Sequence, residues 1–120
     1  MSDAFLCRGS NLRVKKLWEN ANPANSFSRQ TIAVNTTGYD LLFYVFSRGA
    51  GKNPQLSEIS KPGNDVQISF YYGDDKIGAH RRTSQGEDTS KVVFEDAQYN
   101  GTVNNTYLIP IAIYGLAGVE

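Results

Sequence analysis

The chain has 120 residues, a length typical of a single domain, and 40% of them are hydrophobic and 20% charged. Twelve basic and twelve acidic side chains give a formal net charge of zero, which argues against non-specific nucleic-acid binding because that requires surplus positive charge. Cys7 is the single cysteine, which excludes an internal disulfide, and no apolar run approaches the roughly 18 residues that a membrane helix needs. We therefore expect a globular protein that is made in a cytoplasm and does not insert into a membrane.

Short apolar runs alternate with clusters of Gly, Asn, Asp, Ser and Pro along the chain, and helical periodicity is almost absent. This pattern is typical of an all-β domain. Residues 12–19 (LRVKKLWE) form the first predicted strand, with Leu12, Val14 and Trp18 expected on one face and Lys16 interrupting it. A loop at 20–26 separates it from a second predicted strand at 27–34 (FSRQTIAV).

The most strongly predicted strand covers residues 39–47 (YDLLFYVFS), in which both faces are apolar. One face carries Tyr39, Leu41, Phe43 and Val45, and the other carries Leu42, Tyr44 and Phe46. Two apolar faces indicate a central strand or a strand at a subunit contact. We expect the face formed by Leu42, Tyr44 and Phe46 to be buried between subunits.

Residues 48–65 contain several glycines and prolines and are predicted to form a surface loop. Further strands are predicted at 66–72 (VQISFYY), 91–96 (KVVFED) and 107–116 (YLIPIAIYGL). Pro110 lacks a backbone N–H donor, so the last strand is expected at a sheet edge or with a bulge. The prediction is a single antiparallel β-sandwich, jelly-roll-like and of about seven to eight strands, at residues 13–120, preceded by a short N-terminal arm at 1–12.

Residues 72–75 (Tyr-Gly-Asp-Asp) match the turn that holds catalytic magnesium in many template-dependent polymerases. A two-metal polymerase also needs carboxylates from another strand and a palm sheet backed by helices, which this chain is too short to supply. We therefore interpret these residues as a tight turn between two strands. His80 is the single histidine, which excludes a site built on paired histidines. We predict no catalytic residue, metal or cofactor, and we expect that the protein is not an enzyme.

Two groups of side chains are candidates for contact with a ligand or partner. His80, Arg81 and Arg82 form a small cationic patch in one interpretation, and in the other they lie at an exposed strand end where nearby carboxylates offset their charges. The chain is also rich in tyrosine, and Tyr71 and Tyr99 are candidates for exposure. Aromatic side chains with a polar tip suit both sugar stacking and protein interfaces.

Two blocks of the sequence resemble a small domain of virion proteins from tailed bacteriophages and prophages. The first block is LWENANPANSFSRQTI, the last is NNTYLIPIAIYG, and an apolar strand that begins with Tyr-Asp lies between them. The matching residues are Leu17, Trp18, Asn20, Asn22, Pro23, Phe27, Gln30, Thr31 and Ile32 in the first block and Asn104, Asn105, Tyr107, Ile109, Pro110, Ile113, Tyr114 and Gly115 in the last. The resemblance spans about residues 17–117, and the stretches 49–65 and 73–90 depart from it, which leaves the ligand open.

The resemblance implies a virion-associated β-sandwich of tail-fibre, head-fibre or host-attachment type, with no catalytic residues. Such a protein would be synthesised in the host cytoplasm, join other virion proteins and form a homo-oligomer, with a homotrimer as the expected state. The arm at 1–12 precedes the matching region. Within it, Phe5, Leu6 and Cys7 are candidates for a buried anchor that docks the domain onto the particle.

The sequence therefore favours a bacteriophage virion structural protein, located in a tail, baseplate or head fibre, that presents a β-sandwich for assembly and for attachment to a host surface glycan. A stand-alone carbohydrate-binding module is the main alternative. A glycan hydrolase that uses Asp74, Asp75 or Glu95 is the third. Oligomeric state separates the first two, because an assembly protein should associate and a module should stay monomeric.

Overall fold

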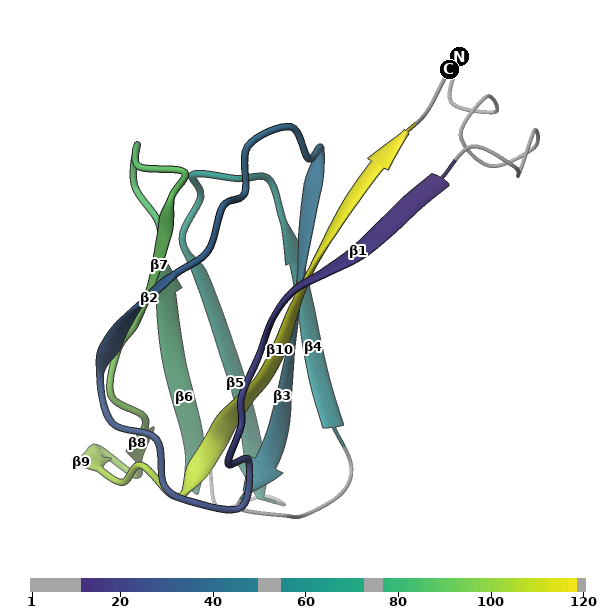
Figure 1. Cartoon of the computed structure of the whole chain (residues 1–120). Coiled ribbons are helices and arrows are strands. Elements are labelled where there is room, and N and C mark those ends of the chain that lie inside the picture. Colours follow the sequence, from purple (N-terminus) through teal and green to yellow (C-terminus); the bar gives the residue numbers. More distant parts are fainter. Residues whose placement is uncertain (1–11, 50–54, 73–76, 119–120) are drawn as a thin grey trace.

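The computed structural model describes residues 12–49, 55–72 and 77–118, and in these ranges the protein is an antiparallel β-sandwich without helices (Figure 1). The strands are β1 (Leu12–Glu19), β2 (Gln30–Ala33), β3 (Leu41–Gly49), β4 (Gln55–Ser60), β5 (Val66–Tyr72), β6 (Ile77–Ser84), β7 (Lys91–Phe94), β8 (Gln98–Tyr99), β9 (Thr102–Val103) and β10 (Tyr107–Gly118). The predicted fold class, an antiparallel β-sandwich, is confirmed, with ten strands in the described residues where about seven to eight were expected. In the described part of the chain no helix is long and apolar enough to cross a membrane.

The strands form two sheets that pack face to face. The four-stranded sheet has the order β1-β10-β3-β4, and the six-stranded sheet has the order β2-β7-β6-β8-β9 with β5 also paired to β6. The chain passes from β1 to β2 and back to β3 between the sheets, as strands do in a jelly roll, whereas β5, β6 and β7 are neighbours within one sheet. Figure 1 shows β1 and β10 continuing together beyond the other strands as a two-stranded ribbon.

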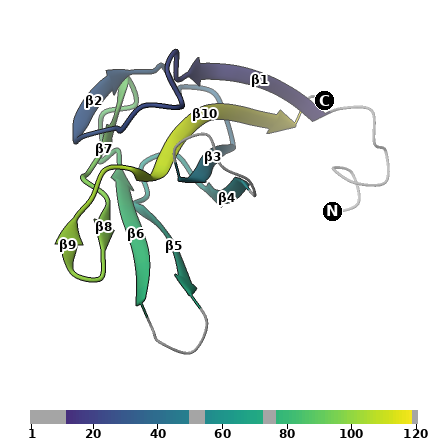
Figure 2. The ribbon, with the colours of Figure 1, turned by 90° about the horizontal axis from the view of Figure 1, so that it is seen from below.

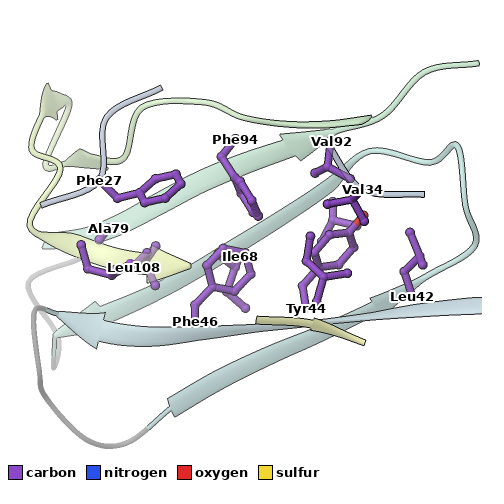
Figure 3. Close-up of a cluster of buried hydrophobic side chains, with 13 residues drawn as sticks. Phe27, Val34, Leu42, Tyr44, Phe46, Ile68, Ala79, Val92, Phe94 and Leu108 are labelled. Carbon is purple, nitrogen blue, oxygen red and sulfur yellow. The ribbon is translucent and has the colours of Figure 1, made fainter. Parts of the chain in front are cut away.

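Phe94 lies at the centre of the core between the sheets, with 1% of its surface exposed. Its ring centroid is 5.6 Å from that of Trp18, 5.5 Å from Phe27, 6.5 Å from Tyr44 and 6.1 Å from Phe46. Three of these pairs are edge-to-face, an arrangement that aromatic rings favour. Figure 3 shows Phe27, Tyr44, Phe46 and Phe94 in the space between the sheets.

The apolar side of β3 that the sequence assigns to a subunit contact belongs to this core. Leu42, Tyr44 and Phe46 have exposed fractions of 0%, 1% and 0%, and they point from β3 toward the opposite sheet of the same chain (Figure 3). The prediction that they form an intersubunit face is therefore wrong. Both sides of β3 are apolar, and the sequence of one strand does not say which side meets the second sheet.

A bulge in β1 changes which side chains share a face. The pairing of β1 with β10 shifts register between Lys16 and Trp18, so that Lys16 lies opposite Tyr114 and Trp18 lies opposite Ile113. Ile113 is buried in the core, and Trp18 therefore turns inward while Lys16 stays outward. The expected common face of Leu12, Val14 and Trp18 is wrong because an extra residue at a bulge reverses the alternation.

Pro110 lies at a second bulge. The last strand, β10, is central in its sheet, between β1 and β3, and its pairing with β3 shifts register between Pro110 and Ala112. Asn20 bonds to this bulge, because its side-chain Nδ2 donates to the Pro110 carbonyl at 2.8 Å and its backbone N–H donates to the Ile111 carbonyl at 2.8 Å. Of the two predicted places for Pro110, a sheet edge or a bulge, the bulge is confirmed.

The remaining differences concern loops. The predicted loop at 48–65 contains β4 and the end of β3, and β8 and β9 are short strands of two residues each. The Gly-Asp-Asp stretch lies outside the described residues. The strands on either side of it pair antiparallel as far as Tyr72 and Ile77. Except for Leu12, the predicted arm at 1–12 also lies outside the described residues.

Candidate functional site: the outward side of the four-stranded sheet

The outward side of the four-stranded sheet is apolar. Side chains directly opposite each other on antiparallel strands point to the same side, so the strand register places two rows across this surface. One row is Val14, Leu116 and Leu41, and the other is Lys16, Tyr114, Phe43 and Ile59. We call the whole surface the apolar face, and its apolar members are Leu12, Val14, Leu41, Phe43, Val45, Ile59, Tyr114 and Leu116. Lys16 lies on the same side, with its Nζ 5.9 Å from the centroid of the Tyr114 ring.

Several side chains of the apolar face are open to solvent. The exposed fraction is 41% for Leu12, 55% for Val14 and 48% for Ile59, and the other members are half-buried. A shallow hollow of about 150 Å³, lined in part by Phe43 and Val45, indents the surface. Exposed apolar side chains that gather on one side of a sheet are a common feature of interaction surfaces.

The outward side of the six-stranded sheet has the opposite character. The register places mainly polar side chains there, among them Thr31, Gln67, Ser69, His80, Arg82, Ser84 and Lys91. Two valines share this side, Val93 and Val103, and Val103 is 55% exposed. A solvated outer face of this kind is ordinary for an antiparallel sheet. The apolar face is therefore a property of one sheet and not of the sandwich as a whole.

The three residues predicted as a cationic patch are divided between the two sides of β6. His80 and Arg82 lie on the outward, polar side, whereas Arg81 points inward and is 0% exposed. The three-residue patch is therefore not formed, because consecutive residues of a strand alternate in direction.

The other predicted contact residues are only partly placed by the structure. Tyr99 packs its ring parallel to that of Tyr107, with centroids 4.5 Å apart and 5° between the planes, and is half-buried. Tyr71 pairs with Gly78 through the β5–β6 ladder, but its side chain lies outside what the structure describes. Phe5, Leu6 and Cys7 also lie outside the described residues.

Arg81 binds backbone carbonyls from three separate segments. Its Nε donates to the Leu108 carbonyl at 2.9 Å, its Nη1 to the Glu95 carbonyl at 2.6 Å, and its Nη2 to the carbonyls of Phe27 and Tyr107 at 2.9 and 3.2 Å. Its Cζ also lies 5.5 Å from the centroid of the Phe27 ring. The guanidinium thus joins β6 to β10, to the chain after β7 and to the chain before β2.

This environment assigns Arg81 a structural role. Burial lowers the pKa of Arg81 to about 10, and the charge of Asp96 opposes that shift. A lowered pKa means that the folded protein destabilises the charged guanidinium, and the carbonyl bonds and the Phe27 ring offset that cost. Because the group faces carbonyls of its own chain, it is not available to a ligand.

Residues 17–32 and residues 104–115, which are far apart in the sequence, contact each other in the fold. Asn20 in the first block donates to the Pro110 carbonyl in the last, and the backbone N–H of Phe27 donates to the Asn105 carbonyl at 2.9 Å. Asn105 also accepts a 2.8 Å bond from the Ala97 N–H through its side-chain oxygen. The bonds from Asn20 and Phe27 therefore fix β10 and the residues before it against the first half of the chain.

Among the described residues, no group of three or more His, Cys, Asp or Glu side chains is placed to hold a metal ion. Comparison of the chain with protein-family models, with curated proteins and with solved structures finds no match. The fold and the site together define an antiparallel β-sandwich with one apolar and one polar outward side.

Proposed function

We propose that the protein is a structural component of a bacteriophage virion, in a tail, baseplate or head fibre, that assembles through the apolar face and presents the rest of the sandwich for attachment to the host surface. The apolar face carries this proposal, because it crosses all the strands of one sheet while the outward side of the other sheet is polar. The similarity of two sequence blocks to phage virion domains supports the setting.

A second copy of the chain is the simplest partner for the apolar face. It offers the same apolar surface, and a net charge of zero gives little repulsion between copies. Near the middle of the face, the rings of Phe43 and Tyr114 lie 6.3 Å apart. Aromatic side chains at the centre of an interface contribute much of its binding free energy, and truncating one at such a hot spot costs about 2 kcal/mol or more. A homotrimer that turns three such faces toward its axis is the arrangement we propose.

The edge of the sheet at β1 is less suited to assembly than the face. β1 is an edge strand, and Arg13 and Lys15 on it are exposed. Positive side chains along an edge oppose the addition of another strand. We therefore place the contact on the face and not along the β1 edge.

Light scattering of the full chain tests the proposal. We expect a mass near three times the monomer mass of 13.3 kDa. The double variant Val14→Lys/Ile59→Lys places two charges on the apolar face at exposed positions and should be monomeric. The matched control, Thr31→Lys/Gln67→Lys, adds the same charges to the polar side of the other sheet and should keep the mass of the parent protein.

A monomeric parent protein at high concentration, or a Val14→Lys/Ile59→Lys variant with the parent's mass, would contradict assembly through the apolar face. A monomeric parent would favour the second candidate function, a stand-alone carbohydrate-binding module. That candidate is supported by a hollow on the side of the sandwich between β1 and β2, which is lined in part by Trp18, Asn22 and Asn25.

A further inference from the structure

A hollow of about 380 Å³ lies where the edge strands of the two sheets are joined by residues 20–29. Figure 1 shows this connection running from the end of β1 to the start of β2. The volume falls within the range of about 300–1,000 Å³ that small-molecule sites occupy. It is larger than the hollow on the apolar face and involves different residues.

Two aromatic rings form part of the wall. Trp18 is half-buried, and its ring centroid lies 6.2 Å from that of Phe27 and 5.6 Å from that of Phe94. The β1 bulge turns Trp18 to this position. Because neighbouring rings hold it, Trp18 offers a fixed aromatic surface, and little conformational entropy is lost when a ligand packs against it.

Amide side chains form the rim, and the loop that carries them is fixed by its own hydrogen bonds. The side-chain oxygen of Asn20 accepts a 2.8 Å bond from the Asn22 N–H, and the Asn25 N–H donates to the Asn22 carbonyl at 3.1 Å. The side-chain amides of Asn22 and Asn25 are exposed and make no hydrogen bond within the described residues. Each can therefore both donate and accept a hydrogen bond to a ligand.

The charge of the hollow selects against anions. Glu19 is the one charged side chain among its described lining residues, and its carboxylate lies 3.3 Å from Lys16 Nζ. No cationic side chain lines the hollow in the described part of the chain. A neutral ligand that carries both hydrogen-bond donors and acceptors therefore fits better than a phosphate or a carboxylate.

We infer that this hollow binds a neutral pyranose ring of a glycan. Trp18 packs against the C–H face of the sugar ring, and the amides of Asn22 and Asn25 bond to its hydroxyl groups, each of which also donates and accepts. This inference rests on the attachment role in the proposed function and names the site and the ligand class for it.

The opposite side of the sandwich provides an internal comparison. A hollow of about 340 Å³ lies there between β4 and β5, and its lining includes Glu58, Asn64 and Gln67 but no aromatic ring. The hollow between β4 and β5 thus resembles the one between β1 and β2 in volume and polarity, but it has no aromatic ring on which a sugar could stack. The combination of an aromatic wall and free amides is found at the hollow between β1 and β2.

The single tryptophan makes the site directly observable, because one indole N–H signal in the NMR spectrum reports Trp18 alone. The probes are the methyl glycosides of glucose, galactose and N-acetylglucosamine, with N-acetylneuraminic acid as the anionic comparison. We expect at least one neutral glycoside to shift the indole signal saturably and the anionic sugar to leave it unchanged.

The double variant Asn22→Ala/Asn25→Ala should bind the same glycoside at least about tenfold more weakly, as expected for the loss of hydrogen bonds to the ligand. The control Asn64→Ala removes an exposed amide from the hollow between β4 and β5 and should bind like the parent. Each single variant, Asn22→Ala and Asn25→Ala, is measured as well, so that a misfolded double variant does not prevent a decision.

The inference is overturned if no neutral glycoside shifts the indole signal, if only N-acetylneuraminic acid does, or if the asparagine variants bind as tightly as the parent. Its failure is distinguishable from failure of the assembly proposal, because the oligomer test changes Val14 and Ile59, which do not line this hollow.

Discussion

The Nε of Arg81 donates a 2.9 Å hydrogen bond to the carbonyl of Leu108, whose φ is 51°. Both side chains are 0% exposed. A leucine in the left-handed region costs about 1–3 kcal/mol and persists where the surrounding structure fixes it. The bond to Arg81 is one of the contacts that hold this backbone in place, so the start of β10 and the middle of β6 stabilise each other.

Replacing Arg81 with methionine should lower the free energy of unfolding by at least about 3 kcal/mol, because the carbonyls it now binds would be buried without donors. Denaturant unfolding followed by Trp18 fluorescence measures this. The control Arg82→Met, at the exposed neighbouring position, should change stability by about 0.5 kcal/mol or less. Equal effects at the two positions would contradict the structural role of Arg81.

Gly115 is required by the ring of Tyr39. A Cβ atom at Gly115 would lie 2.5 Å from Cδ1 and 2.6 Å from Cγ of Tyr39. Gly115→Ala should therefore destabilise the fold by about 1–3 kcal/mol through overpacking. In a Tyr39→Ala background the same substitution should cost less than about 1 kcal/mol, and a double-mutant cycle measures the difference. The same cost in both backgrounds would show that Tyr39 is not the obstacle.

The assignment of the two sides of the four-stranded sheet can be tested by truncation at Leu42 and Leu12. Leu42→Ala should lower the free energy of unfolding by about 2–5 kcal/mol because it opens a cavity in the core. Leu12 is 41% exposed, so Leu12→Ala should lower it by less than about 1 kcal/mol. Both are measured in the Val14→Lys/Ile59→Lys background, so that contacts between subunits do not contribute. Similar costs at the two positions would contradict the assignment.

Ionisation of Tyr44 should make the fold less stable at alkaline pH. Burial raises the pKa of Tyr44 from 10.0 to about 12. A group whose pKa is higher in the folded state contributes stability below its unfolded pKa and loses that contribution as pH rises through its folded pKa. The stability advantage of the parent over Tyr44→Phe should therefore fall between pH 10 and 12, by on the order of 2–3 kcal/mol.

Unfolding of the parent and of Tyr44→Phe is compared at fixed pH values across this range. The lowered pKa of Arg81 changes stability in the opposite direction, but it is common to both proteins and cancels in the difference. A difference that stays constant from pH 9 to pH 12 would mean that the Tyr44 hydroxyl ionises as readily in the fold as in the unfolded chain.

The sandwich could be predicted from the sequence because apolar runs and turn residues alternate over most of the chain. The strands β1, β2, β3, β5, β7 and β10 lie within two residues of their predicted positions at one end or both. β4 was missed, because its sequence, QLSEIS, carries two apolar residues within a stretch of glycines and prolines. Strands of two residues, such as β8 and β9, leave no periodic signal.

The directions of side chains were harder to predict than the strands. Neither side of β3 is polar, so the choice between Leu42 and Phe43 as the core residue depends on the second sheet. The β1 bulge leaves no mark in the apolar pattern and changes the side to which Trp18 points. The inward direction of Arg81 could be predicted from the sequence, because alternation along β6 places Arg81 on the side opposite to His80 and Arg82.

Leu12 and Gly118 pair with each other at the outer end of the β1–β10 ribbon, so the described chain enters and leaves the sandwich at one place (Figure 2). A pulling force applied through these two residues would open the ribbon from that end, and the hydrogen bonds between the strands would break in succession. Antiparallel strands pulled apart in this direction resist less than strands that slide along each other, because only the outermost bonds bear the force at any moment. Held by these two strand ends, the sandwich would therefore yield first at the β1–β10 ribbon, and attachment points that make paired strands slide along each other would meet more resistance.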